Sequence, residues 1–240
     1  MKQIIQIVAA ALIFFGLILY STVTASAESP VPAGFSDELT DSELPPDLFD
    51  ENCDGGPSCP GRIFSDMPAA GHWSHVPIDW ALTHHITAGT TPTTFSPGNG
   101  CTRSQAVTFL WKACGSPGYA GGDCPFQDVP EGAYYRDAVL WAVENQITSG
   151  TSPDAFSPGK VCTRAQIVTF LWRAKGSPAP DDPSEPLLFQ DVAENAYYRN
   201  AVLWATKTGV TGGTSPTTFS PDKTCTRAEI VTFLYKAIHG

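Results

Sequence analysis

Two short segments of the chain carry apolar side chains at helical spacing. Ala138, Val139 and Trp141 belong to a stripe with the one- and three-residue spacings of one helix face, which predicts a helix over about 136–146. A second stripe of the same kind follows Thr163 and ends at the sequence KGSP. Gly, Pro, Ser and Thr dominate the stretch between the stripes, which predicts a structured loop. The pattern therefore predicts a helix-loop-helix unit.

The same unit occurs three times along the chain. FSDMP, FQDVP and FQDVA open the copies, ITAGT, ITSGT and VTGGT lie in their loops, and Cys-Thr-Arg precedes each second helix. Trp141 follows Trp80 by 61 positions, and Trp204 follows Trp141 by 63. One helix pair is too small to bury a core, whereas three pairs can share one. We therefore expect a mainly α fold with pseudo-threefold symmetry. The repeats are assigned to 62–120, 121–182 and 183–240.

The N-terminal segment is interpreted as an export signal. A short basic start precedes an apolar run over residues 4–19 and the small-residue pattern ASA at 25–27, which is the layout of a cleaved signal peptide. We assign residues 1–27 to this signal, with an uncleaved anchor as the alternative. No other segment approaches membrane length, so no membrane contact is expected after cleavage. Residues 28–61, rich in Pro, Gly and acidic side chains, are predicted to be a spacer that buries little surface.

The seven cysteines divide into two groups. Export permits disulfides, although an odd number leaves at least one thiol unpaired. Cys53 with Cys59, and Cys114 with Cys124, would each close a short loop. The other three occupy equivalent repeat positions, where a small buried side chain is favoured over a three-thiolate metal site, because structural zinc usually takes four ligands. These are Cys101, Cys162 and Cys225.

Each second helix is predicted to begin with a capping box. Thr, with Gln or Glu three residues later and an apolar helical stripe after it, is the signature of this motif. The expected N-caps are Thr102, Thr163 and Thr226, and their partners are Gln105, Gln166 and Glu229.

The arginine that follows each Thr is not explained by capping. At the first helical position, a cation meets the positive end of the helix dipole. Two interpretations stay open. One is an ion pair with an acid of the loop or of the neighbouring repeat, with Asp66, Asp128 and Asp191 as candidates. In the other, the arginine and the free backbone N–H groups bind an anion.

In combination, these motifs resemble the S-layer homology (SLH) domain. The resemblance covers residues 62–240 and rests on the F-x-D opening, the aromatic of GHW and AYY, the ITxGT…FSP loop and the Thr-Arg-Ala-Glu-like unit. The family implies a three-pronged spindle around a shared helical bundle, with one prong per repeat. It also implies noncovalent attachment of exported proteins to the bacterial cell wall, through a secondary cell-wall polysaccharide that often bears pyruvyl ketals.

The resemblance also implies ligand-binding residues in grooves between the prongs. By position, the arginines that would face the sugar carboxylate are Arg103, Arg164 and Arg227. Weaker candidates are the F-x-D acids Asp66, Asp128 and Asp191 and the aromatics Trp73, Tyr134 and Tyr197. Two repeats depart from the pattern, because Gln replaces Glu in the first two capping units. The mid-helix residues Trp80, Trp141 and Trp204 are interpreted as core.

Two functions are compatible with these motifs. The favoured one is a wall anchor of the cell surface or S-layer that binds polysaccharide in the inter-repeat grooves. The alternative is an adaptor or surface-layer protein whose main partner is another exported protein, and peptidoglycan is a further candidate partner. The net charge of −10 argues against nucleic acid, which requires a basic face.

Catalysis and metal binding are not expected. No Ser-His-Asp set, HExxH motif or phosphate loop occurs, so we predict neither an enzyme nor a cofactor. Four histidines gather in the first repeat without counterparts in the others, and we interpret them as residues of a solvated helix rather than as a metal site. They are His72, His75, His84 and His85.

Overall fold

The computed structural model describes residues 53–180, 182 and 185–240. The predicted signal peptide and most of the predicted spacer lie outside these residues. Each repeat contributes a short first helix and a longer second helix, which confirms the mainly α class. The first helices are α1 (His75–Thr83), α3 (Arg136–Glu144) and α5 (Arg199–Lys207). The second helices are α2 (Arg103–Ala113), α4 (Arg164–Ala174) and α6 (Arg227–His239).

All three second helices begin with the predicted capping box. In α4, the Thr163 hydroxyl accepts a hydrogen bond from the backbone N–H of Gln166 at 3.3 Å, and the Gln166 side chain accepts one from the Thr163 N–H at 3.1 Å. The first helices have no side-chain cap. Their ends are therefore held by packing and by the surrounding loops.

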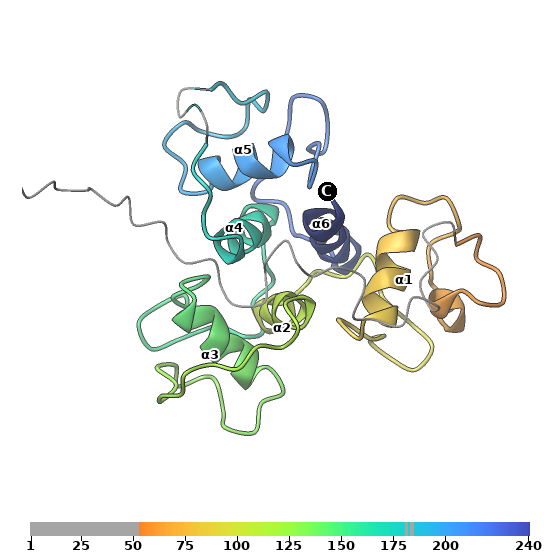
Figure 1. Cartoon of the computed structure of the whole chain (residues 1–240), viewed down its shortest axis with the longest axis horizontal. Coiled ribbons are helices and arrows are strands. Elements are labelled where there is room, and N and C mark those ends of the chain that lie inside the picture. Colours follow the sequence, from red (N-terminus) through yellow and green to blue (C-terminus); the bar gives the residue numbers. More distant parts are fainter. Residues whose placement is uncertain (1–52, 181, 183–184) are drawn as a thin grey trace, which may run out of the picture.

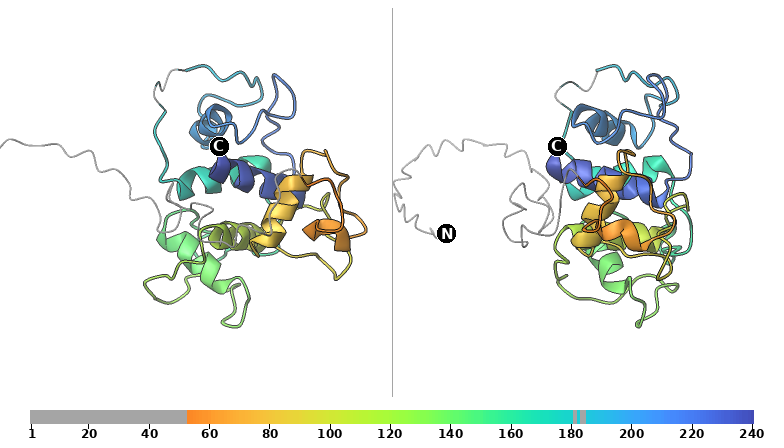
Figure 2. Two further views of the ribbon diagram at one scale, coloured as in Figure 1. Left: turned by 45° about the vertical axis from the view of Figure 1, so that its right-hand side comes forward. Right: turned by 90° about the vertical axis from the view of Figure 1, so that its right-hand side faces the viewer.

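The two helices of one repeat are not partners in the fold. Instead, α2 packs against α3, α4 against α5, and α6 against α1, so each pair joins consecutive repeats. The helices α2, α4 and α6 also contact one another at the centre of Figure 1. The two views in Figure 2 likewise place α1 beside α6. The first helix of each repeat thus packs against the second helix of the preceding repeat, and that of repeat one against α6 of repeat three, a pairing that apolar periodicity alone does not specify.

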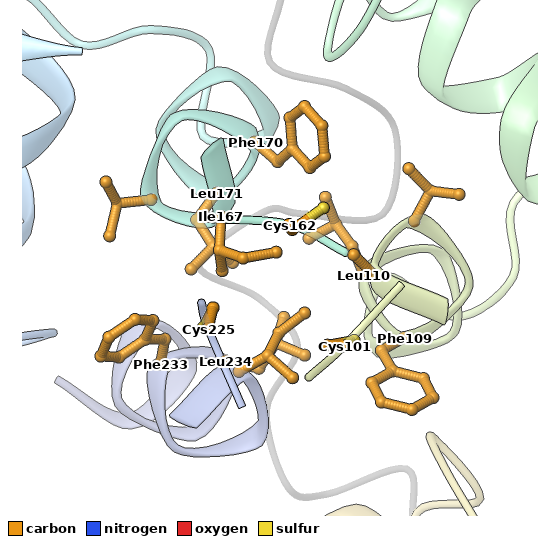
Figure 3. Packing of buried hydrophobic residues seen from close by; sticks show 14 of the residues in the cluster. Cys101, Phe109, Leu110, Cys162, Ile167, Phe170, Leu171, Cys225, Phe233 and Leu234 are labelled. Atoms are coloured by element: carbon orange, nitrogen blue, oxygen red, sulfur yellow. The ribbon is translucent and has the colours of Figure 1, made fainter. Parts of the chain in front are cut away.

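The three equivalent cysteines meet at the centre of the molecule (Figure 3). The Cys101 N–H donates to the Cys225 carbonyl at 2.9 Å, the Cys162 N–H to the Cys101 carbonyl at 2.9 Å, and the Cys225 N–H to the Cys162 carbonyl at 3.0 Å. We call this closed set of three backbone hydrogen bonds the cysteine ring. All three side chains are fully buried, as predicted. Within the described part of the chain, the three thiols do not form a cluster of candidate metal ligands.

The remaining core predictions are largely confirmed. Trp80 and Trp141 are buried, and Trp204 packs against the edge of the same core. All seven cysteines are unpaired, so neither of the two possible loop disulfides is formed in this structure. Over the described ranges, no helix is both long and apolar enough to cross a membrane.

The last residues assigned to the spacer are folded. A 3-10 helix, η2 (Pro60–Ile63), packs against α1, and Cys59 just before it is buried. The folded region therefore begins before residue 62, where the sequence placed the boundary. Composition predicted a spacer because the segment is acidic and Pro-rich, and it gave no sign of the contacts with α1.

Candidate ligand-binding grooves

The F-x-D acid of each repeat fixes the loop that precedes the second helix. Both carboxylate oxygens of Asp128 accept backbone hydrogen bonds, from the N–H of Phe156 at 2.8 Å and of Ser157 at 2.7 Å. Asp66 and Asp191 hold the corresponding residues of their own loops in the same way. The acids are thus bonded to the loop backbone and form no ion pair with the arginines within the described part of the chain.

Each repeat arginine extends into the loop of the next repeat. Arg103 Nε donates to the Phe156 carbonyl at 2.8 Å, and its guanidinium lies 4.8 Å from the centre of the Phe156 ring and 5.5 Å from that of Phe170. The same contacts recur around Arg164 and Arg227. Arg227, in the third repeat, extends to the loop of the first repeat. These cation–π contacts and carbonyl bonds explain why a cation is kept at a helix start.

The charge around the arginine differs between the repeats. Arg164 Nη1 donates to Glu229 Oε1 at 2.8 Å, which forms an ion pair with the capping glutamate of the following repeat. The residues equivalent to Glu229 are Gln105 and Gln166. Arg103 and Arg227 instead bond through Nη2 to threonine hydroxyls, Thr148 at 3.2 Å and Thr87 at 3.3 Å, and Arg227 Nη2 also reaches the Ala88 carbonyl. The expected ion pair with a neighbouring repeat is therefore present in one groove, and its acid is Glu229.

Burial lowers the pKa of Arg103 and of Arg227, because desolvation disfavours the charged guanidinium. Neither residue has an ion-pair partner in the described ranges. Each arginine also keeps one terminal nitrogen without a hydrogen-bond partner among the described residues: Nη1 in Arg103 and Arg227, and Nη2 in Arg164. The unused Nη1 groups of Arg103 and Arg227 are donors that an anion can satisfy, whereas Nη2 of Arg164 is buried.

The aromatic residues of the AYY and GHW motifs are exposed. The exposed fractions of Trp73, Tyr134 and Tyr197 are 55%, 68% and 63%. Tyr197 lies close enough to Arg103 to raise the pKa of the guanidinium electrostatically, and Tyr134 acts on Arg227 in the same way. Around Arg103, an arginine of repeat one therefore lies near an acid of repeat two, Asp128, and a tyrosine of repeat three, Tyr197. The surroundings of Arg103 and of Arg227 therefore each draw on all three repeats.

Sequence reasoning missed a second cation at these grooves. Arg173, in the last turn of α4, donates to the Ile147 carbonyl at 3.1 Å and lines a pocket with Thr148 and Ser149. Lys112 takes the same position in α2 and donates to the His85 carbonyl at 3.1 Å. Lys236 is the third member. A basic residue nine positions after each repeat arginine was the available signal.

The S-layer homology domain family matches residues 63–107, 125–168 and 188–231, which together make up more than half of the chain. The chain belongs to the SLH domain family. This SLH chain is 23% identical over 176 residues to an S-layer protein of Bacillus thuringiensis subsp. finitimus, a match that covers 73% of this chain and 21% of that protein. It is 31% identical over 104 residues to the surface-layer 125 kDa protein of Lysinibacillus sphaericus, covering 43% of this chain and 8% of that protein.

Some relatives are named as enzymes. The match to an amylopullulanase of Thermoanaerobacterium thermosulfurigenes is 25% identical over 179 residues and covers 72% of this chain but 9% of that protein. The SLH chain thus spans a small part of the relatives it matches. SLH domains are binding domains, and the membership indicates a secreted protein of the cell wall or S-layer, held there by its repeats.

Proposed function

We propose that this SLH chain anchors to the bacterial cell wall by binding a secondary cell-wall polysaccharide whose terminal sugar carries a pyruvyl carboxylate. The observation that carries the proposal is the unused Nη1 group on each of two clamped arginines, Arg103 and Arg227. A guanidinium fixed by loop carbonyls is preorganised for a carboxylate. The exposed aromatic beside it offers an apolar face to the C–H surface of a sugar ring.

The three grooves are not equivalent in this proposal. Glu229 already neutralises Arg164, so an anionic sugar entering that groove would meet a carboxylate. Arg103 and Arg227 lack such a counter-ion within the described ranges, and Lys112 and Arg173 add positive charge at the grooves. The grooves of Arg103 and Arg227 are therefore the favoured carboxylate sites.

The proposal is tested by sedimentation of the purified chain with cell-wall sacculi. We expect retention on untreated walls and loss of retention after chemical removal of the pyruvyl-bearing polymer. Equal retention on stripped walls contradicts the polysaccharide proposal and favours peptidoglycan or a protein partner.

Substitution of an exposed aromatic residue tests the binding site more cleanly than substitution of an arginine. The arginine side chains bond the loop of the next repeat, so Arg→Ala changes would mix lost binding with lost stability. Tyr197→Ala removes an exposed side chain and should leave thermal unfolding unchanged while weakening wall binding about fivefold, the scale of a contact that contributes about 1 kcal/mol. Leu188→Ala is the matched control, because Leu188 is 73% exposed. Unchanged binding by Tyr197→Ala would remove this face from the site.

A further inference from the structure

A second cluster of chemically reactive side chains lies at the start of the folded region, away from the repeat arginines. It consists of Cys53, Cys59, His75 and Asp79, whose ligand atoms all lie within 4.8 Å of one another. Cys59, His75 and Asp79 have exposed fractions of 3%, 2% and 1%. His75, expected on a solvated helix, is thus buried with two thiols and a carboxylate.

The distances within the cluster match the edges of a metal-centred tetrahedron. Zinc binds sulfur at about 2.3 Å and nitrogen or oxygen at about 2.0–2.2 Å, so tetrahedral geometry separates neighbouring ligand atoms by about 3.3–3.8 Å. Cys59 Sγ lies 3.7 Å from His75 Nε2 and 3.2 Å from Asp79 Oδ2, and His75 Nε2 lies 3.3 Å from Asp79 Oδ2. The four ligand atoms come from two segments of the chain, residues 53–59 and helix α1.

Backbone hydrogen bonds to the outer atoms of His75 and Asp79 leave their inner atoms, Nε2 and Oδ2, available to bind a metal. His75 Nδ1 bonds the Pro68 carbonyl at 2.7 Å, which assigns the ring proton to Nδ1 and leaves the Nε2 lone pair for a ligand bond. The Gly61 N–H donates to Asp79 Oδ1 at 2.8 Å and orients Oδ2 inward. Backbone partners of this kind are typical of the second shell around a bound metal.

The other two repeats provide an internal comparison. The positions equivalent to His75 and Asp79 are Arg136 and Leu140 in the second repeat, and Arg199 and Leu203 in the third. Arg136 donates to the carbonyl of Val129, which directly precedes Pro130, the equivalent of Pro68, so a bond from this helix position to the loop needs no histidine. A buried aspartate in place of a buried leucine costs free energy unless it is paired. The histidine and the aspartate both occur in the first repeat, which follows Cys53 and Cys59.

We propose that these four residues bind a structural zinc ion that ties the segment before the first repeat to α1. Two thiolates, an imidazole and a carboxylate are suited to zinc in a closed tetrahedral site. A Cys53–Cys59 disulfide is the competing use of the thiols, since exported proteins meet oxidising conditions. It would not account for His75 and Asp79, because the buried carboxylate would lose its thiol partners.

The test uses the purified chain with zinc as the probe. We expect about one zinc per chain by elemental analysis after dialysis. Cobalt substitution should give the intense visible bands of tetrahedral thiolate coordination. Chelation should lower the thermal midpoint, because metal binding stabilises the folded state. A Cys53–Cys59 disulfide in the purified chain, or zinc content far below one equivalent, overturns the proposal.

A double variant separates zinc loss from misfolding. His75→Arg with Asp79→Leu installs the residues of the other repeats and should fold, lose the zinc and become insensitive to chelator. Cys124→Ser and His72→Ala are matched controls outside the cluster and should keep the full zinc content. Zinc content in the double variant equal to that of the unaltered chain would show adventitious binding and refute the site. The sedimentation assay is independent of this result, because the cluster lies outside the proposed carboxylate grooves.

Discussion

At the scale of the residue, one side-chain oxygen in place of an amide nitrogen changes the charge of a groove. Glu229 and Gln166 both close a capping box, so the helix start is the same for either residue. Their side chains differ in what they offer the arginine of the preceding repeat. Glu229 supplies Arg164 with an ion pair, whereas Arg103 faces the repeat that carries Gln166. The residue three positions after the threonine therefore has two effects. It completes the capping box of its own helix, and it sets the charge beside the arginine of the preceding repeat.

Glu229→Gln should raise carboxylate binding in the groove of Arg164. The substitution keeps the capping box, as Gln166 does, and frees a guanidinium that is now neutralised. We expect about tenfold tighter binding of a pyruvylated sugar at that groove, because a charge-assisted hydrogen bond contributes about 1.5–3 kcal/mol. Titration calorimetry measures it, and Gln166→Glu is the reciprocal control, with weaker binding expected at the groove of Arg103. No change in either variant would mean that the arginines do not meet the carboxylate.

At the scale of the element, the second helices are defined by their first turn and the first helices by their surroundings. A capping box satisfies two backbone N–H groups at each second helix, while no side chain caps the first helices. The stability of the central three helices should therefore depend directly on the Thr at each N-cap.

Thr163→Ala should lower the free energy of unfolding by about 1 kcal/mol, within the range of about 0.5–2 kcal/mol for lost caps. The N–H of Gln166 then loses its acceptor while the surrounding core is unchanged. Urea denaturation measures the difference. The control is Thr217→Ala at an exposed loop position, which should stay within about 0.5 kcal/mol of the unaltered chain. Equal effects of the two variants would contradict a capping role.

The positions of the helices were easier to predict from the sequence than the choice of which helices pack together. Apolar spacing and the Thr-x-x-Gln/Glu motif are local signals, so they located α3, α4 and the caps. The pairing of α2 with α3 joins two different repeats. Because the three repeats are similar in sequence, the apolar pattern does not say which repeat supplies the partner of α2. The site was predictable in part for the same reason: the repeat arginines are marked by position, whereas the partner Glu229 and the approach of Cys59 to Asp79 depend on packing.

At the scale of the whole molecule, the cysteine ring joins the three repeats at their centre. Burial raises the pKa of Cys162 to about 11 and also raises the pKa of Cys101 and Cys225. The folded state therefore holds the thiol protons more tightly than the unfolded chain, in which a thiol titrates near about 8.5. This stabilisation is fully present below the unfolded pKa and is lost as the pH rises towards the folded one.

The free energy of unfolding should consequently fall above about pH 8.5, by up to about 1.4 kcal/mol per thiol for each pH unit. Urea denaturation at a series of alkaline pH values measures the slope. A variant with alanine at all three ring positions is the control and should show a shallower decline, although its stability at neutral pH is lower. Identical slopes would assign the alkaline loss to other groups.

The pairing of α6 with α1 gives the repeat array a property that stacked repeats lack. In a solenoid, each unit contacts only its neighbours, so units can be added and the ends need caps. Here the last repeat supplies the partner of the first, and no repeat is terminal. Removing one would leave two helices without partners, and inserting one would open the cysteine ring. The number three is thus enforced by closure, in the way that a closed β-barrel fixes its number of strands by leaving no edge.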